Sequence, residues 1–252
     1  MLELKRNADG SLNTRSLSAH LRQSLIQVNT RNRRPLRPSG HFNVRDVAEC
    51  PRSIGLRRLG VQPPPPDYDS LIRMQRGKEE EARVISMYHH LGLVSHSNLR
   101  LKRTLPSYGG IVLVGECDII LLNALLVEVK QTSEENYRKW KTWDDLPQGY
   151  KDQGNLYCFM FTLREGLFHI AVRGTSNFHI LPFVPDDERN YYNLYRFADL
   201  EATLSVGGLP EPDHSEYYCA YKECWKYPVT EVDSGSGRTL SSDGGTSESP
   251  TI

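Results

Sequence analysis

Two carboxylates and a lysine stand in neighbouring apolar segments of this chain. The first segment ends in GECD at Asp118, and the second contains EVK beginning at Glu128. Both segments are rich in Val, Ile and Leu, which favours strands, and the Asn123-Ala124 pair between them predicts a hairpin turn. Glu128 and Lys130 are two residues apart, so on a strand their side chains leave the same face. We therefore expect Asp118, Glu128 and Lys130 to meet beside a sheet.

These three groups are suited to metal-assisted phosphodiester hydrolysis. Mg²⁺ prefers carboxylate oxygens and keeps several of its waters. An ion held by Asp118 and Glu128 would acidify a bound water and offset charge on the phosphorus centre. Lys130 would orient or deprotonate that water, or hold the scissile phosphate as a point charge. The alternative is an ordinary ion pair on the polar face of a hairpin.

A helix is expected after the second strand. Pro147 marks its start, and Tyr150, Gln153 and Tyr157 recur at i, i+3 and i+7, so they share one face. Taken alone, the three residues would also suit aromatic core positions. Their place directly after the EVK strand favours a part in the same site.

The ordered set of motifs resembles the PD-(D/E)XK nucleases. Within that superfamily it is similar to the RecB-like branch, which includes CRISPR-associated adaptation nucleases and phage exonucleases. The resemblance covers roughly residues 42 to 224. The motifs that carry it are GxxD ending at Asp118, ExK at Glu128 and Lys130, and QxxxY at Gln153 and Tyr157.

The resemblance implies a role for each of these residues. Asp118, Glu128 and the backbone carbonyl of Val129 would bind the metal, with Lys130 at the nucleophilic water. Gln153 and Tyr157 would position the phosphate or the water. A further ligand is implied on an upstream helix, four residues after a glycine, and Glu81 stands there after Gly77. The adaptation nucleases generally have His at that position, whereas lambda-type phage exonucleases have Glu.

The upstream stretch FNVRDVAECPRS resembles the N-terminal element of the family, a short helix that ends in CPR. Asn43 is a plausible N-cap, and Asp46 fits a capping-box position in charge. Iron–sulfur members of the branch bind a cluster with one Cys before the nuclease core and three after it.

Three of the five cysteines fit that cluster pattern. Cys50 matches the first position, and Cys219 and Cys224 match the last two. The remaining cysteine position holds Glu216, so His214 or Glu216 is the candidate fourth ligand. The alternatives are a 4Fe-4S cluster, a zinc ion, or no metal with thiols that pack as small hydrophobes. The other two cysteines, Cys117 and Cys158, are expected in the core.

The expected fold is α/β, a restriction-endonuclease-like core with a mixed central β-sheet flanked by helices and an N-terminal helical arm. Residues 1–40 form a polar, basic arm in which Leu17, Leu21 and Leu25 would line a helix. Residues 41–232 form the nuclease domain with the Cys staple, and residues 233–252, rich in Ser and Gly, form a disordered tail. Other expected elements are a helix at 77–91, a hairpin at 99–114 that turns at 108–110, strands at 168–173 and 178–184, and a helix at 187–205. Tyr192, Leu194, Phe197 and Leu200 are the apolar positions of that last helix.

The net charge is zero, so no global charge calls for nucleic acid, although a groove can be locally basic. A basic cluster is expected to border the metal site and steer a DNA backbone; its members are Arg138, Lys139, Lys141 and Lys151. Trp140 and Trp143 would stack on an unpaired base or simply pack. The basic stretch at 31–37 would contact phosphates or remain solvated surface charge.

The sequence shows no signal-peptide pattern, no membrane-length apolar run and no disulfide framework, so we expect a cytoplasmic protein with no membrane partner. The resemblance implies a Mg²⁺- or Mn²⁺-dependent DNA exonuclease acting on single strands or duplex ends. Its setting would be phage or prokaryotic recombination, repair or CRISPR adaptation, with protein partners in such a complex. The alternatives are a structure-selective or transposon- or restriction-type endonuclease, and a catalytically silent DNA-end-binding subunit.

Overall fold

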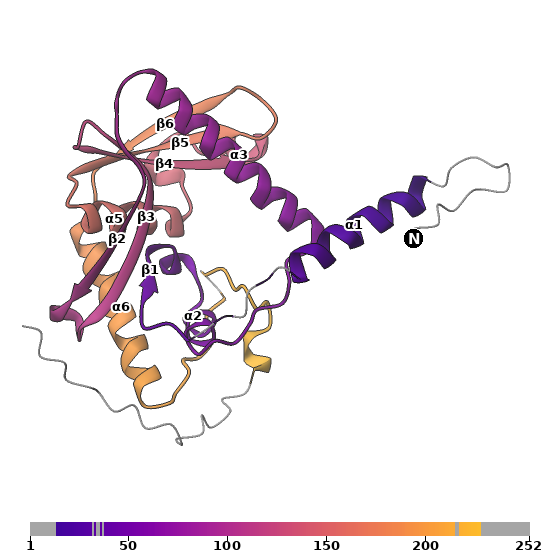
Figure 1. The fold of residues 1–252 in the computed structure, drawn as a ribbon. Helices are drawn as coiled ribbons and strands as arrows, with labels where there is room; N and C mark the ends of the chain where they lie inside the picture. Colours follow the sequence, from indigo (N-terminus) through magenta and orange to yellow (C-terminus); the bar gives the residue numbers. More distant parts are fainter. Residues whose placement is uncertain (1–13, 32, 34–35, 37, 215–216, 228–252) are drawn as a thin grey trace, which may run out of the picture.

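A mixed six-stranded sheet with helices on both faces forms the centre of the described chain (Figure 1). The computed structural model describes residues 14–31, 33, 36, 38–214 and 217–227. The strands are β1 (Phe42–Asn43), β2 (Val94–Leu105), β3 (Ile111–Leu121), β4 (Leu125–Thr132), β5 (Glu165–Val172) and β6 (Phe178–Phe183). The α-helices are α1 (Thr14–Arg31), α2 (Pro51–Arg58), α3 (Tyr68–His90), α4 (Glu134–Lys139), α5 (Gln148–Phe161) and α6 (Asp187–Ser205). The 3-10 helices are η1 (Val44–Ala48), η2 (Pro106–Tyr108), η3 (Trp143–Asp145) and η4 (Cys224–Lys226). The fold class predicted from the sequence, a mixed sheet flanked by helices with an N-terminal helix, is confirmed.

The long strand β3 organises the sheet. On one edge it pairs antiparallel with β2 from Ile111 to Leu121. On the other edge it pairs parallel with the short β1 at Leu113 and Val114, and antiparallel with β4 from Ile119 onward. Next to β4 lies the parallel strand β5, and β6 pairs antiparallel with β5.

Helices bury apolar side chains against both faces of the sheet. On one face, Val84 of α3 packs with Ile119, Val127 and Val129. On the other face, α5 and α6 cover a larger core. That core includes Phe42, Leu113, Leu126, Leu156, Phe168 and Phe197. Because neighbouring residues of a strand point to opposite faces, Val127 and Val129 pack under α3 and leave Glu128 and Lys130 on the α5 side.

The β3–β4 hairpin is present, and its turn includes the predicted Asn123-Ala124 pair. Leu121 pairs with Leu125, so the loop comprises residues 122–124. Leu122 and Asn123 both have positive φ, and the Ala124 N–H donates to the Leu121 carbonyl at 2.9 Å, which closes the tight turn.

Two predicted helices differ in extent from the structure. The helix α3 begins at Tyr68, well before the predicted start at Gly77, because the Asp67 carboxylate accepts the Ser70 N–H at 2.7 Å and caps it. The element around Cys50 is two helices instead of one. The 3-10 helix η1 ends at Ala48, and Pro51, which has no N–H to donate, begins α2.

The last long helix was predicted correctly in its bounds, 187–205, and corresponds to α6. Leu194, Phe197 and Leu200 are buried in it as expected. The prediction for Tyr192 is wrong, since its side chain is 51% exposed and its ring lies under the Arg189 guanidinium. Cys117 and Cys158 are both fully buried, as predicted.

The basic arm contains the helix α1, in which Leu21 is exposed. The side chain of Leu17 and the tail at 233–252 lie outside the described residues. The division of the chain at residues 40 and 232 therefore stays a prediction. Among the described residues, no helix is long and apolar enough to cross a membrane.

Lowering the pH is expected to destabilise the fold through His169 on β5. Its ring is 1% exposed and burial lowers its pKa to about 4, whereas the unfolded chain titrates near 6.5. A lowered folded-state pKa means that the stability is present above pH 6.5 and is lost as the pH falls toward 4. Between pH 7 and 5.5 this group should cost about 1 kcal/mol of unfolding free energy.

Urea denaturation of the parent and of His169→Gln at both pH values measures this effect. The parent should lose more stability than the variant over that interval. His90→Gln, at an exposed position of α3, is the matched control and should behave as the parent. An equal pH dependence in the parent and in His169→Gln would contradict the assignment.

Candidate functional site

The candidate site lies at a gap in the sheet between β3 and β4. Along this edge β3 pairs with β1 up to Val114 and with β4 only from Ile119 onward, so residues 115–118 have no strand partner there within the described chain. Asp118 Oδ2 instead accepts the backbone N–H of Val129 at 2.8 Å. The carboxylate replaces a main-chain acceptor at the point where the two strands diverge, and this bond fixes Asp118 beside β4.

Glu128 and Lys130 project from β4 toward α5. Glu128 is 1% exposed, and its Oε2 accepts a hydrogen bond from Lys130 Nζ at 2.7 Å. The same Nζ lies 5.5 Å from the ring centroid of Tyr150 on α5. The second oxygen of Glu128, Oε1, is buried and has no hydrogen-bond partner among the described residues.

Burial disfavours the charged form of three carboxylates of the site. It raises the pKa of Glu128, with Asp118 adding to the shift and Lys130 opposing it. Burial also raises the pKa of Asp118. The pKa of Glu81 on α3 is raised by burial and next by Asp118, which puts Glu81 within electrostatic reach of the other two.

This donor set fits a hard divalent cation. Buried carboxylates that repel one another are stabilised by a bound positive charge, and Glu128 Oε1 is an acceptor still without a partner. The structure thus brings Asp118, Glu128 and Lys130 together as the sequence predicted, with Glu81 nearby. Metal binding by the backbone carbonyl of Val129 stays a prediction.

On α5, Gln153 and Tyr157 face the same gap. Gln153 Nε2 donates to the Tyr157 hydroxyl at 3.5 Å. Tyr157 is 2% exposed, and its pKa is raised by burial and next by Glu128, so its hydroxyl remains a proton donor. Its ring packs against Gly115, where a Cβ would lie 3.1 Å from Tyr157 Cε1 and 2.9 Å from Val44 Cγ2. A glycine is required in the GxxD motif because η1 and α5 both approach the backbone of β3 here.

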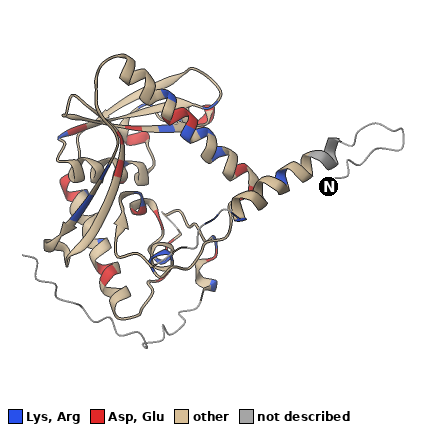
Figure 2. Ribbon diagram, in the orientation of Figure 1, with Lys and Arg blue, Asp and Glu red and all other residues tan. Residues whose placement is uncertain are grey.

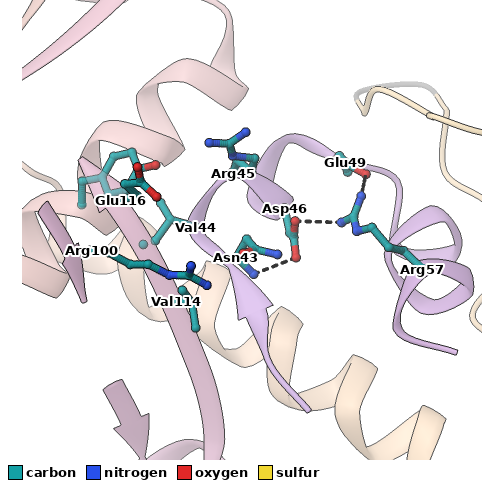
Figure 3. Close-up of a pocket in the computed structure, with 11 residues that line it drawn as sticks. Asn43, Val44, Arg45, Asp46, Glu49, Arg57, Arg100, Val114 and Glu116 are labelled. Atoms are coloured by element: carbon teal, nitrogen blue, oxygen red, sulfur yellow. Dashed lines mark hydrogen bonds and ion pairs between the residues drawn. The ribbon is translucent and has the colours of Figure 1, made fainter. Parts of the chain in front are cut away.

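A cavity of about 330 Å³ adjoins this site. It is lined by η1, β2 and β3 and by Tyr157 (Figure 3). Arg45 and Arg100 border it, and neither guanidinium forms an ion pair with a described residue. A third guanidinium, that of Arg57, is bound by Asp46 and by Glu49, each at 2.7 Å.

Sequence reasoning missed Arg45, Arg100 and Glu116 as residues of this cavity. Arg45 does carry a signal, because it stands inside the FNVRDVAEC stretch next to the capping residue Asp46. Arg100 carries none, since it is one cation among several on a polar strand. Only the antiparallel register, which pairs Arg100 with Glu116, brings it to the cavity.

Two of the four members of the predicted basic cluster are paired with acidic side chains. Arg138 and Lys139 form exposed ion pairs with Glu134 and Glu135 along α4. On a neighbouring element, α3, acidic and basic residues also alternate along the helix (Figure 2). Of the two readings for Trp143, packing is the one observed, since its ring stacks on Phe183 at 4.2 Å between centroids.

A second cluster lies where the C-terminal segment meets the N-terminal element. Cys50, Cys219 and Cys224 come together with His214, and their ligand atoms all lie within 4.8 Å of one another. Burial, together with the neighbouring Cys219 and Cys50, raises the pKa of the Cys224 thiol to about 12. This Cys₃His set could bind a metal ion. The other candidate ligand, Glu216, lies outside the described residues.

Known proteins resemble this chain in structure but not in sequence. No protein-family model and no curated protein sequence matches it. The crystal structure of SSO0001 has a TM-score of 0.50 at 14% identity over 74% of this chain and 85% of that one. LHK-Exo, an alkaline exonuclease from Laribacter hongkongensis solved in complex with dAMP, has a TM-score of 0.50 at 16% identity over 66% and 91%. At these identities the likeness shows a shared fold.

Replacing Gly115 by Ala should destabilise the protein by about 1–3 kcal/mol, because the added methyl overpacks against Val44 and Tyr157. Urea unfolding measures the change. Gly77→Ala is the matched control. Gly77 lies inside α3 with open space around its Cα, so alanine there should leave the stability unchanged or raise it. Equal stability of Gly115→Ala and the parent would contradict the close approach.

Proposed function

We propose that this chain is a Mg²⁺- or Mn²⁺-dependent DNA exonuclease of the PD-(D/E)XK superfamily, in its RecB-like branch, which hydrolyses phosphodiester bonds from DNA ends. The observation that carries the proposal is the convergence of Asp118, Glu128 and Lys130 at a gap in the sheet. It is supported by a fold that resembles that of an alkaline exonuclease.

The residues that would hold the ion are Glu81, Asp118, Glu128 and the carbonyl of Val129. A bound divalent ion supplies Lewis-acid charge, which acidifies a water and offsets the charge that develops on the phosphate. The protein's part is to keep its ligands fixed. The Val129 N–H holds one oxygen of Asp118, and Lys130 holds one oxygen of Glu128, so each carboxylate keeps its other oxygen for binding.

Lys130 would act as a fixed positive charge more than as a base. Burial lowers its pKa, but Glu128 and Asp118 outweigh that effect, and the net shift is upward. The group is therefore an ammonium at neutral pH. Held between Glu128 and the ring of Tyr150, it would bind the scissile phosphate or orient the attacking water.

The adjoining cavity would seat the DNA strand next to the scissile bond. Tyr157 lines the cavity and is close enough to Glu128 for that carboxylate to raise its pKa, so the cavity lies next to the carboxylates. Arg45 and Arg100 supply positive charge without an ion-pair partner there, and guanidinium groups bind phosphate with paired donors. The fold accommodates a nucleotide in at least one other protein, since LHK-Exo was solved with dAMP.

Substituting Lys130 by Ala should lower kcat at least a hundredfold on end-labelled linear DNA with Mn²⁺, because a fixed charge at the reacting phosphate is lost. Gel analysis of product release, with single strands and duplexes as separate substrates, measures it. Lys139→Ala, which removes an exposed and paired lysine of α4, is the control and should retain full activity. Chelation of divalent ions should stop the parent enzyme.

Three outcomes would contradict this proposal. Equal degradation of DNA by Lys130→Ala and by the parent would contradict the role assigned to Lys130. Cleavage of covalently closed circular DNA would favour the endonuclease alternative, since an exonuclease needs an end. DNA-end binding without turnover by the parent would instead favour a catalytically silent subunit.

Substituting Arg45 by Ala should raise KM for DNA about tenfold with a smaller change in kcat, because one phosphate contact is lost away from the reacting atoms. The slope of log KM against log salt should also fall by about one. Steady-state assays at several salt concentrations test both. Arg138→Ala, which removes a paired surface arginine, is the matched control. An unchanged KM in Arg45→Ala would contradict the proposal that the cavity binds the DNA strand.

A further inference from the structure

The Cys₃His set ties the two ends of the described core together. Cys50 follows η1 near the N-terminal end, whereas His214, Cys219 and Cys224 belong to the C-terminal segment. Cys50 Sγ lies 4.0 Å from Cys224 Sγ, and His214 Nε2 lies 3.0 Å from the same sulfur. At 4.0 Å the two sulfurs are too far apart for a disulfide, whose S–S bond is about 2 Å.

These spacings suit a single ion. A tetrahedral zinc with ordinary bond lengths sets two thiolate sulfurs about 3.8 Å apart and a sulfur and an imidazole nitrogen about 3.6 Å apart. The two observed distances, 4.0 and 3.0 Å, lie on either side of those values. A 4Fe-4S cluster binds each thiolate to a different iron, so its ligands must surround four irons and four sulfides. Ligand atoms that all lie within 4.8 Å of one another enclose too little space for that core.

We infer that Cys50, His214, Cys219 and Cys224 bind one tetrahedral metal ion of the zinc type, in place of the iron–sulfur cluster that the family resemblance implies. Three thiolates and one imidazole are a common structural zinc set, and they leave no open position for a substrate. The site is therefore structural, and it does not depend on whether the chain is a nuclease.

Neighbouring groups support the ligands. The Asp213 N–H donates to Cys50 Sγ at 3.4 Å, a contact that favours a thiolate. Arg52 donates to the carbonyls of Pro210, Cys224 and Tyr227 at 3.0–3.1 Å and so braces the segment that carries three of the ligands. The Cys50 N–H donates to the Tyr218 carbonyl at 2.9 Å. These contacts hold the four ligand atoms near one another from both ends of the chain.

The primary test is metal analysis of the full chain, purified both in air and anaerobically so that oxidative loss of a cluster is not mistaken for zinc binding. We expect one zinc per chain, little iron or acid-labile sulfide, and no visible absorbance. Replacing zinc with Co²⁺ should give the visible bands of a tetrahedral thiolate site. About four irons and four sulfides per chain, an absence of bound metal, or a disulfide between Cys50 and Cys224 would each overturn the proposal.

Variants identify the ligands without relying on activity. Cys219→Ser and His214→Gln should lower the zinc content well below one per chain, and a zinc chelator should lower the Tm of the parent until Zn²⁺ is added back. Cys158→Ala and His90→Gln, outside the cluster, are the matched controls and should keep one zinc. A full zinc content in His214→Gln would contradict the assignment of His214 as a ligand. A parent protein with zinc but no nuclease activity would overturn the proposed function and leave this inference intact.

Discussion

The hydrogen bond from the Val129 N–H to the Asp118 carboxylate is the interaction on which the candidate site depends. Strands β3 and β4 pair side by side next to their turn and separate beyond Ile119. Without an acceptor, the Val129 N–H would be left unsatisfied at a half-buried strand edge, which costs free energy. Asp118 satisfies it and is oriented by it. One bond therefore both ends the strand pairing and aims a carboxylate at Glu128.

The site also lowers the stability of the fold, because it brings several carboxylates together where they are shielded from water. Burial raises the pKa of Glu81, Asp118 and Glu128, Asp118 raises the pKa of the other two further, and Lys130 offsets only part of this effect. A purely structural arrangement would pair each buried carboxylate, as Arg189 pairs with the buried Asp152 at 2.7 Å elsewhere in the chain. Unbalanced buried acids are typical of sites that take up a cation, because the ion supplies the missing charge.

The sequence predicted the parts of the fold and site that depend on local pattern. Alternating apolar and charged residues placed Glu128 and Lys130 on one face of β4, and helical spacing placed Gln153 and Tyr157 on one face of α5. The start of α3 at Tyr68 and the two helices around Cys50 were missed, since a cap at Asp67 and a break before Pro51 override the wider pattern. Arg100 could not be found either. Its part in the cavity follows from strand register, a long-range property that one sequence does not display.

The element η1 links the cluster of Cys50, Cys219, Cys224 and His214 to the candidate functional site. The side chain of its Val44 packs closely over the backbone of Gly115, and its Arg45 borders the cavity. Arg57 binds Asp46 of η1 and the following Glu49, and Arg196 donates to the Val47 carbonyl at 3.0 Å. Cys50 comes directly after this network, so a metal ion there would anchor the end of η1 that the sheet does not hold. Because β1 contributes only two paired residues, such an ion would add to the contacts that hold Arg45 beside the cavity. The position of Arg45, which we propose binds phosphate, would thus be supported in part by a metal site formed by the two ends of the core.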